Sequence, residues 1–365
     1  MKRVLFIVPL PPPVHGSSMI SQYIKDSKQI NESYRCDYVN LSTSRKMEEI
    51  GNKTFVKIWR FLSSLLRTMG LLLTHKYDRC FISITCHGKG FLKDMPFVLL
   101  CKMFGGKIIL HQENKGMSRD VDRWPYNWLM PIVYRNAKVV LLSWLLYPDI
   151  EKVVKREQVV ICPNCAAGID SCLNRIGNQS PRILYLGNMI VGKGVLFLLD
   201  ALKILHDNGC DFVSDYVGGE TAEINSNRFS EEVHKRNLDG IVTYHGSKVG
   251  KEKDRLLYEA DIFVFPTFYH NESFPLVLLE AMQHKLPIVT TNEGGISDIV
   301  NDGDNGFICE KNNPESLANC IKRLLDDKQL RIKMGENGYN KYRQEYTIQT
   351  FEKRIIQLLD NSNSQ

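Results

Sequence analysis

The stretch Arg182–Gly194, with the sequence RILYLGNMIVGKG, decides how this chain folds. Its first five residues form a short, mostly apolar run that predicts a buried β-strand. A glycine-rich turn follows from Gly187 to Gly194, and a helical pattern begins directly after it. The glycines permit close backbone approach to a ligand, and Lys193 supplies a positive charge. The stretch predicts a strand, a turn and a helix in succession, although such a turn alone is weak support for a binding site.

The same alternation of short strand-like runs and longer amphipathic stretches extends in both directions and occurs in two sets. Strands alternating with helices are typical of parallel sheets covered by helices, so the fold class predicted is α/β with two doubly wound domains. The strand candidates are Val4–Val8, Cys80–Ile84, Lys107–Leu110, Lys138–Leu142 and Gln158–Ile161, then Arg182–Leu186, Asp211–Val217, Ile241–Tyr244, Asp261–Phe265, Pro287–Thr291 and Gly306–Cys309.

A linker is expected over Cys162–Ser180, which is rich in Gly, Asn and Pro and lacks apolar periodicity. We therefore predict an N-terminal domain over residues 1–172 and a C-terminal domain over 173–365, whose last helix could pack back on the first domain. In open α/β sheets, ligands bind beyond the carboxyl ends of the strands. Two such sheets facing each other would form an interdomain cleft.

The composition is that of a globular protein of 365 residues, with 43% hydrophobic and 24% charged residues. These values and a mean hydropathy of −0.22 argue against a polytopic membrane protein. The N-terminal run Met1–Val8 imitates a signal peptide, but the prolines that follow stop it too early for an export core. Ten dispersed cysteines are typical of reduced thiols in a cytoplasmic protein. Cys162 and Cys165 resemble a redox or metal pair, yet a loop with coincidental thiols is favoured.

Charge is distributed unevenly between the two halves. Residues 1–175 contain 26 Lys and Arg against 14 Asp and Glu, whereas residues 176–365 contain 21 against 27. Residues 50–77 have no acidic side chain and combine apolar residues with cations at helical spacing, namely Lys53, Lys57, Arg60 and Arg67. This segment is either a sheet-covering helix with a solvated basic stripe or a helix that docks on anionic lipid, with Trp59 and Phe61 near the headgroups.

The sharpest motif is NESFPLVLLEAM at 271–282, which follows the strand candidate Asp261–Phe265. Glu272 lies in the expected strand-to-helix turn, and the amides after it open a helix whose positive end favours a phosphate. Glu280 must point off the apolar face or be buried with a hydrogen-bonding partner, such as ribose hydroxyls. Neither G-x-G-x-x-G nor the P-loop spacing is present, which counts against a nicotinamide dehydrogenase and a P-loop NTPase.

Together these segments closely resemble glycosyltransferase family 4, the retaining, nucleotide-sugar-dependent enzymes of the GT-B fold with two facing Rossmann-like domains. The family's glutamate pair matches Glu272 and Glu280, its glycine turn matches Gly294-Gly295, and its Asp-Gly-x-x-Gly element matches Asp302–Gly306. The resemblance is strong across about residues 181–325 and diffuse before them.

The resemblance also implies roles for individual residues. Glu280 would hold the ribose, Glu272 would contact the donor sugar, and Lys193 would neutralise the diphosphate. Asn188 replaces the family's usual arginine, which leaves neutralisation more dependent on Lys193 and helix dipoles. His111 matches a strand-end histidine that faces the donor sugar. The remaining substrate-binding candidates are Gly16 in the first glycine loop, Gly187, Gly218, and the backbone of Ser273, Phe274, Pro275 and Leu276, of which Pro275 has no N–H.

The predicted function is transfer of a sugar, with retention, from a nucleotide-sugar donor to a glycan acceptor, which the family resemblance and the basic half suggest is lipid-linked and part of cell-surface polysaccharide synthesis. The acceptor hydroxyl would enter on the leaving-group face. Lys193, amides and a helix N-terminus can stabilise the departing diphosphate, so neither a metal nor another cofactor is expected. An epimerase and a non-catalytic nucleotide-sugar-binding protein are alternatives, whereas a phosphorylase of similar fold is disfavoured because no segment suggests a pyridoxal-binding lysine. Nucleic-acid binding is disfavoured because no aromatic-interleaved basic motif is present.

Overall fold

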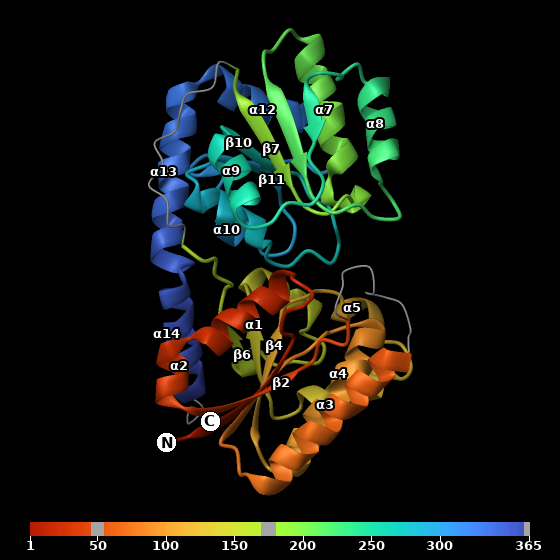
Figure 1. Ribbon diagram of the computed structural model, residues 1–365, viewed down its shortest axis with the longest axis vertical. Coiled ribbons are helices and arrows are strands. Elements are labelled where there is room, and N and C mark those ends of the chain that lie inside the picture. The colour runs from red at the N-terminus through yellow and green to blue at the C-terminus, as the bar shows by residue number, and fades with distance from the viewer. Residues whose placement is uncertain (45–54, 169–179, 361–365) are drawn as a thin grey trace. The chain divides into compact units, whose positions relative to one another are not determined.

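The computed structural model describes residues 1–44, 55–168 and 180–360, and the chain divides into two compact units (Figure 1). The N-terminal unit comprises Met1–Cys165 and Ile348–Gln365, and the C-terminal unit comprises Ala166–Thr347. The domain boundary predicted after residue 172 lies outside the described residues. The last helix, α14 (Ile348–Asp360), belongs to the N-terminal unit, where the Tyr34 hydroxyl donates to the Ile356 carbonyl at 3.3 Å.

The N-terminal unit is built on a six-stranded parallel sheet with the order β2-β1-β3-β4-β5-β6. Its first strand is buried throughout Val4–Val8, because helices cover both faces of a parallel sheet; α3 and α4 lie on one side of it, and α2 and α14 on the other (Figure 1). The strands are β1 (Arg3–Val8), β2 (Arg35–Asn40), β3 (Arg79–Ser83), β4 (Lys107–Gln112), β5 (Lys138–Leu141) and β6 (Val159–Ile161). The other elements are α1 (Gly16–Asp26), α2 (Lys28–Ser33), α3 (Phe55–Thr74), α4 (Gly88–Met103), α5 (Met117–Asp120), α6 (Tyr126–Tyr134), η2 (Trp144–Asp149) and η3 (Arg156–Gln158).

The C-terminal unit has a second six-stranded parallel sheet, with the order β12-β11-β10-β7-β8-β9. Its strands are β7 (Arg182–Leu186), β8 (Val213–Val217), β9 (Val242–Tyr244), β10 (Ile262–Phe265), β11 (Ile288–Thr291) and β12 (Gly306–Cys309). Its helices are η4 (Val191–Lys193), α7 (Val195–Asp207), α8 (Ser226–Lys235), α9 (Lys251–Glu259), α10 (Leu276–Gln283), α11 (Ile296–Ile299), α12 (Pro314–Asp326) and α13 (Lys328–Glu345).

The predicted α/β class with two doubly wound sheets is confirmed, and each predicted strand exists within a few residues of its expected bounds. One strand was missed. The edge strand β2 carries Arg35 and Asp37 and is mostly half-buried, so it lacks the continuous apolar run of the inner strands. The cleft predicted between facing sheets stays a prediction.

The order of each sheet places a switch point where the chain changes direction across the sheet. In the N-terminal unit this point lies between β1 and β3, and in the C-terminal unit between β7 and β10. The loops leaving two adjacent strands diverge there to opposite faces of the sheet and open a crevice, which is where α/β proteins bind ligands. The topology therefore selects one candidate site in each unit.

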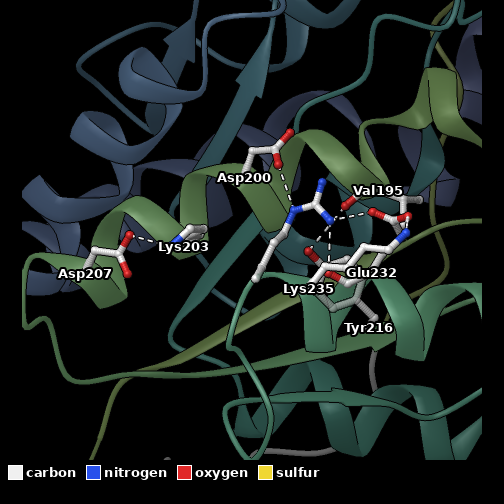
Figure 2. A network of polar contacts seen from close by, with 8 residues as sticks. Val195, Asp200, Lys203, Asp207, Tyr216, Glu232 and Lys235 are labelled. Carbon is white, nitrogen blue, oxygen red and sulfur yellow. Dashed lines mark hydrogen bonds and ion pairs between the residues drawn. The ribbon is translucent and has the colours of Figure 1, made fainter.

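Helix α8 is fixed to α7 by a charge cluster centred on Arg236 (Figure 2). The Arg236 guanidinium donates to Asp200 of α7 at 2.7 Å and to Glu232 of α8 at 2.6 Å. Lys235 adds a second ion pair to Glu232 at 2.9 Å, and hydrogen bonds from both cations lower the pKa of that carboxyl. Because α7 follows the glycine-rich turn, this cluster helps to hold the first turn of the candidate site in place.

Helix α3 corrects one detail of the lipid-docking interpretation of the basic segment, and the docking itself stays a prediction. Phe61 packs inward, with its ring centroid 5.7 Å from that of Phe97, so its predicted place near lipid headgroups is wrong. Arg60 is half-buried and donates to the Thr43 carbonyl at 2.9 Å, and Lys57 is also half-buried. The exposed side chains are mainly apolar, since Trp59 and Leu66 are 66% and 60% exposed, and Arg67 is the predicted cation that is also exposed. Lys53 lies outside the described residues.

The two thiols of the Cys-Pro-Asn-Cys sequence are both buried in the N-terminal unit and are not joined in a disulfide. Burial raises the pKa of Cys162 to about 12 and that of Cys165 well above its usual range. Because the thiolate is the reactive form, such thiols are poor redox centres. Cys172 lies outside the described residues.

Candidate active site

The glycine-rich turn after β7 is tied to the neighbouring strand by backbone hydrogen bonds. The Gly187 amide donates to the Val217 carbonyl, and the Met189 amide donates to the Gly219 carbonyl, both at 2.9 Å. The turn ends at Gly194, whose φ of +84° favours glycine. A Cβ there would also lie 2.3 Å from the Pro266 carbonyl oxygen. These contacts fix the backbone at Gly194, and hence the position from which the side chain of the preceding residue, Lys193, extends.

The turn after β10 lies against this first turn at the switch point. The Phe268 amide donates to the Gly192 carbonyl at 2.8 Å, which joins the two turns directly. The Glu272 amide donates to the Tyr269 carbonyl at 2.8 Å and closes the second turn. Residues far apart in the sequence are thus held together by backbone contacts.

Lys193 and Glu272 form the charged centre of the site. The Lys193 Nζ lies 3.4 Å from the Glu272 Oε2, with side-chain exposures of 21% and 11%. Two aromatic rings lie beneath the ammonium, those of Phe265 at 5.7 Å and Tyr269 at 5.9 Å. Burial and the Glu272 charge together raise the pKa of Tyr185 well above its usual range. A low-exposure charge pair of this kind can interact strongly with a polar ligand.

Two buried polar atoms at this centre lack a hydrogen-bond partner among the described residues. They are the Glu272 Oε2 and the Ser273 Oγ. Buried polar atoms in native proteins are nearly always hydrogen-bonded, so each such atom calls for an explanation. Here both atoms belong to one turn at a switch point, where a bound ligand would supply the missing partners.

A third turn, after β11, supports this arrangement from the other side. The Gly295 amide donates to the Ser273 carbonyl at 2.6 Å. Gly294 has a φ of +56°, and a Cβ there would lie 2.4 Å from the Glu272 carbonyl oxygen. Gly294 is needed because the backbone segments of two turns approach closely here, which the sequence indicated only as a possible turn.

Helix α10 begins directly after the charged turn. Pro275 is its N-cap residue and Leu276 its first residue. The first amides of a helix have no intrahelical acceptor and present a positive end, which suits an anionic ligand. Phe274 is buried, with its ring centroid 5.9 Å from that of Tyr346, so its side chain contributes packing.

Glu280 lies on α10 and has a partner that the sequence did not reveal. Lys253 of α9 donates to the Glu280 Oε1 at 2.7 Å, and both side chains are about one quarter exposed. The burial cost expected for this acid is therefore offset by an ion pair. A ribose hydroxyl would share the carboxylate with Lys253 or replace it.

The glycines at 187 and 218 serve packing between strands. A Cβ on Gly218 would lie 1.8 Å from the Gly187 carbonyl oxygen, so a side chain there requires a backbone shift. Gly187 itself lies against the ring of Phe265 and the hydroxyl of Tyr185, each 3.1 Å from a Cβ built there. Asn188 is exposed beside them, and its carbonyl accepts from the Tyr185 hydroxyl at 3.3 Å.

The N-terminal unit has a cavity of about 610 Å³ at the carboxyl ends of β2, β1, β3 and β4, across its own switch point. His111, predicted from the sequence, lines this cavity, and Gly16 is the first residue of α1, whose neighbours His15 and Ser17 line it as well. The His111 Nδ1 lies 3.4 Å from the Glu113 Oε1. The His111 Nε2 and the Glu113 Oε1 have no hydrogen-bond partner among the described residues.

Glu113 is a candidate that sequence reasoning missed. It follows β4 by one residue, so its place just past a strand end was the available signal. Burial raises the pKa of Glu113 to about 7, while a hydrogen bond from Ser17 opposes this shift. Burial lowers the pKa of His111 to about 4, so the imidazole is neutral near pH 7. The pair can exchange hydrogen bonds with ligand hydroxyls.

The segment that contains the C-terminal site is similar to known proteins. Residues 174–341, which include both turns and the Glu280 helix, match the family described as glycosyl transferases group 1. This segment of the chain is therefore similar to the group 1 glycosyltransferases. The chain is 28% identical over 176 residues to the capsular polysaccharide biosynthesis glycosyltransferase CapM of Staphylococcus aureus, covering 48% of the chain and 45% of CapM.

A longer match is to the lipopolysaccharide 1,2-N-acetylglucosaminetransferase of Salmonella typhimurium. It is 28% identical over 246 residues and covers 62% of this chain and 63% of the Salmonella protein. The chain therefore spans less than two thirds of the length of these relatives.

Solved structures share the fold along the whole chain. A glycosyltransferase from Rickettsia africae has a TM-score of 0.78 and 17% identity, covering 100% of this chain and 99% of its own. HepE of Anabaena in complex with UDP has a TM-score of 0.73 and 15% identity, covering 98% and 99%. The two Rossmann-like units of the chain thus have the GT-B fold.

Proposed function

We propose that the protein is a retaining glycosyltransferase that moves a sugar from a nucleotide-sugar donor to a glycan acceptor. The observation that carries this proposal is the Lys193–Glu272 pair, 3.4 Å apart at the β7/β10 switch point and next to the start of α10. Cleavage of a nucleotide sugar creates negative charge on the diphosphate and positive charge on the sugar ring. A cation, a carboxylate and a helix N-terminus at one point can stabilise both.

Each residue of the C-terminal site has a distinct task in this proposal. Lys193 and the first amides of α10 hold the diphosphate and stabilise the charge that it gains on leaving. Glu272 faces the sugar, where its negative charge favours an oxocarbenium-like ring. Glu280 accepts hydrogen bonds from the ribose hydroxyls. Because the chain supplies this positive charge itself, we propose that transfer requires no metal, and activity should persist in EDTA.

The donor class is tested first by binding. A ligand that prefers the native state raises the apparent stability, so a thermal-shift screen against UDP-, GDP-, ADP- and dTDP-sugars identifies the base. We place UDP-sugars first, because UDP is bound in the HepE structure of the same fold. Lys193→Ala and Glu280→Ala should each reduce the shift. Lys203→Ala is the matched control, since Lys203 pairs with Asp207 on exposed α7 surface.

Turnover is tested with the same variants and a panel of glycan acceptors. Sugar transfer by wild type that falls in Lys193→Ala and Glu272→Gln, with Lys203→Ala unaffected, supports the proposal. Nucleotide-sugar binding without transfer to any acceptor would favour a non-catalytic binding protein. Conversion of the donor with no acceptor added would favour an epimerase. Wild-type turnover in both site variants would eliminate this site.

The acceptor proposed is a lipid-linked glycan of cell-surface polysaccharide synthesis. Capsule and lipopolysaccharide enzymes are among the relatives, which supports this class. We place the acceptor sugar in the N-terminal cavity. There the His111 Nε2 and the Glu113 Oε1 have no hydrogen-bond partner among the described residues and could bind sugar hydroxyls.

We also propose that α3 docks on an anionic membrane at the cytoplasmic face. Trp59, Leu62, Leu66, Met69 and Leu73 are exposed and recur every three or four residues, so they form one outward stripe, here called the α3 stripe. A contiguous stripe of exposed apolar side chains is typical of an interaction site. The absence of acidic residues from 50–77 favours anionic lipid as the partner. Within the described part of the chain, none of the helices is long and apolar enough to cross a bilayer.

Flotation with vesicles of equal parts phosphatidylcholine and phosphatidylglycerol tests membrane docking. Wild type should float, and the double variant Trp59→Ser/Leu66→Ser should remain at the bottom of the gradient. Val249→Ser is the matched control, because Val249 is also exposed but lies in the C-terminal unit. Failure of wild type to float would remove the lipid proposal while leaving the transferase proposal intact.

A further inference from the structure

The cavity of the N-terminal unit has two helix N-termini at its wall. Ser17 and the N-cap residue His15 bring the start of α1 to it, and Lys89 and Gly90 bring the start of α4. Both helices exceed two turns, so each presents a positive end to the cavity. The Gly88 amide is already bound by Asp120 at 2.7 Å, which leaves the amides of the next residues for a ligand.

Three lysines from two helices line the same cavity. Lys57 comes from α3, and Lys89 and Lys93 come from successive turns of α4. The Lys93 charge, after burial, also lowers the pKa of His15, so this ammonium acts on the start of α1 as well as of α4. Cations and helix ends of one sign converge on one cavity.

Among the described residues that line the cavity, acidic side chains are fewer than lysines. Asp94 is buried, with one oxygen accepting from the Thr85 amide at 2.9 Å and the other 3.2 Å from the Lys93 Nζ. Glu113, the second acid, is largely desolvated by burial, which favours its neutral form. Lys89 is exposed at the cavity and forms no ion pair with the residues that the structure describes. The balance of charge therefore attracts an anion.

Buried polar atoms point to a ligand independently of the charges. The Ser83 Oγ and the His111 Nε2 line the cavity, belong to side chains 8% and 1% exposed, and have no hydrogen-bond partner among the described residues. Such atoms are costly unless a ligand or water binds them. They lie near the carboxyl ends of β3 and β4, and β3 is one of the two strands at the switch point.

We infer that this cavity recognises a phosphorylated glycoside, with the phosphate group at the start of α4 between Lys89 and Lys93 and the sugar hydroxyls at Ser83 and His111. This inference rests on the proposed function and narrows its acceptor to one that carries a phosphate near the reacting sugar. The phosphate could belong to a soluble sugar phosphate or to a lipid phosphate, and the test separates these sources.

Binding by isothermal titration calorimetry to the intact protein tests the inference. The probes are glucose 1-phosphate, its neutral counterpart methyl glucoside, inorganic phosphate and dodecyl phosphate. We expect glucose 1-phosphate to bind at least tenfold more tightly than methyl glucoside, because charge-assisted hydrogen bonds are the stronger ones. Tighter binding of dodecyl phosphate than of inorganic phosphate would assign the phosphate to a lipid, and the reverse would assign it to a soluble ligand.

Variants locate the binding within the cavity. Lys89→Gln and Lys93→Gln should each weaken the binding of glucose 1-phosphate about tenfold. The affinities for methyl glucoside and for the nucleotide sugar should not change. Lys25→Gln is the matched control, because Lys25 is exposed in the last turn of α1, at the far end of a helix that lines the cavity. Lys89 is exposed, so its variant should fold even if Lys93→Gln does not.

Equal affinity for glucose 1-phosphate and methyl glucoside, or unchanged affinity in Lys89→Gln, would overturn the inference. Nucleotide-sugar binding measured on the same samples keeps this failure separate from failure of the proposed function. A protein that binds nucleotide sugar but does not discriminate phosphate refutes only the acceptor class. A protein that binds no nucleotide sugar refutes the transferase proposal.

Discussion

Loss of the Lys193 charge should destabilise the folded protein as well as reduce turnover. At 3.4 Å, two unit charges in a medium of effective dielectric constant about 20 attract by about 5 kcal/mol. Desolvation of two mostly buried groups offsets part of this energy. Lys193→Met would leave the Glu272 carboxylate buried without a counter-charge. We expect the free energy of unfolding to fall by about 1–3 kcal/mol, at the lower end of the cost of breaking a buried pair, since Lys193 is 21% exposed.

A double-mutant cycle separates this pair from a general loss of packing. Glu272→Gln removes the charge that Lys193→Met leaves unpaired, so the double variant should regain at least about 1 kcal/mol over the sum of the single effects. Catalysis should behave differently, because both charges act on the ligand. Turnover should fall about 10²- to 10³-fold in Lys193→Met and should not recover in the double variant.

The assays are urea unfolding and steady-state transfer kinetics on the four proteins of the cycle. Lys203→Met is the control, because its ion pair to Asp207 lies on the surface and such pairs contribute little. Single effects that add to within about 0.5 kcal/mol would show that the two charges are not coupled in the free protein. Recovery of turnover in the double variant would refute the catalytic assignment of both residues.

Three further predictions concern packing and pH. Gly218→Ala should cost about 2–3 kcal/mol in urea unfolding, because its Cβ would overlap the Gly187 carbonyl; an unchanged midpoint would contradict this packing. Arg236→Met should lower the thermal midpoint by about a few degrees, since it removes the hydrogen bonds to the carboxylates of Asp200 and Glu232. Nucleotide-sugar affinity should not change. An unaltered midpoint would show that the cluster does not stabilise the fold. Between about pH 4 and 6.5, the lowered pKa of His111 makes stability rise with pH, whereas the raised pKa of Glu113 makes it fall from pH 4.5 toward 7. Glu113→Gln should leave only the rise in thermal unfolding across this range, and a profile parallel to wild type would refute the linkage.

Local patterns were sufficient for much of the C-terminal unit. The strand-turn-helix sequence around Gly187–Gly194 and the glutamates at 272 and 280 lie within short segments, and each segment carries its own turn and helix signals. The same reasoning could not find Lys253, because nothing in α9 shows that it lies against α10. One of the two interpretations of the basic segment also placed Phe61 near lipid, whereas it packs against Phe97 of α4, because helical periodicity does not tell which apolar side chains face inward.

The N-terminal site was harder to predict because its residues come from four strand ends with little local signature. His111 was identified through resemblance to a family, whereas Glu113 needed the structure to show its burial beside that histidine. The lysines of α4 are ordinary surface residues in the sequence. They become candidate ligand-binding residues only because the start of α4 lines the cavity in the folded unit.

By itself the amino-acid sequence determined the alternation of strands and helices, the glycines at tight turns and the residue types that can hold a diphosphate, because these depend on neighbours within a few positions. Only the tertiary structure decided which strands adjoin, and hence where each sheet has its switch point. That order brings Lys193 to Glu272 and places the starts of α1 and α4 at one cavity. The physical reason is that electrostatic and hydrogen-bond energies depend on distances of a few ångströms, which sequence separation does not specify.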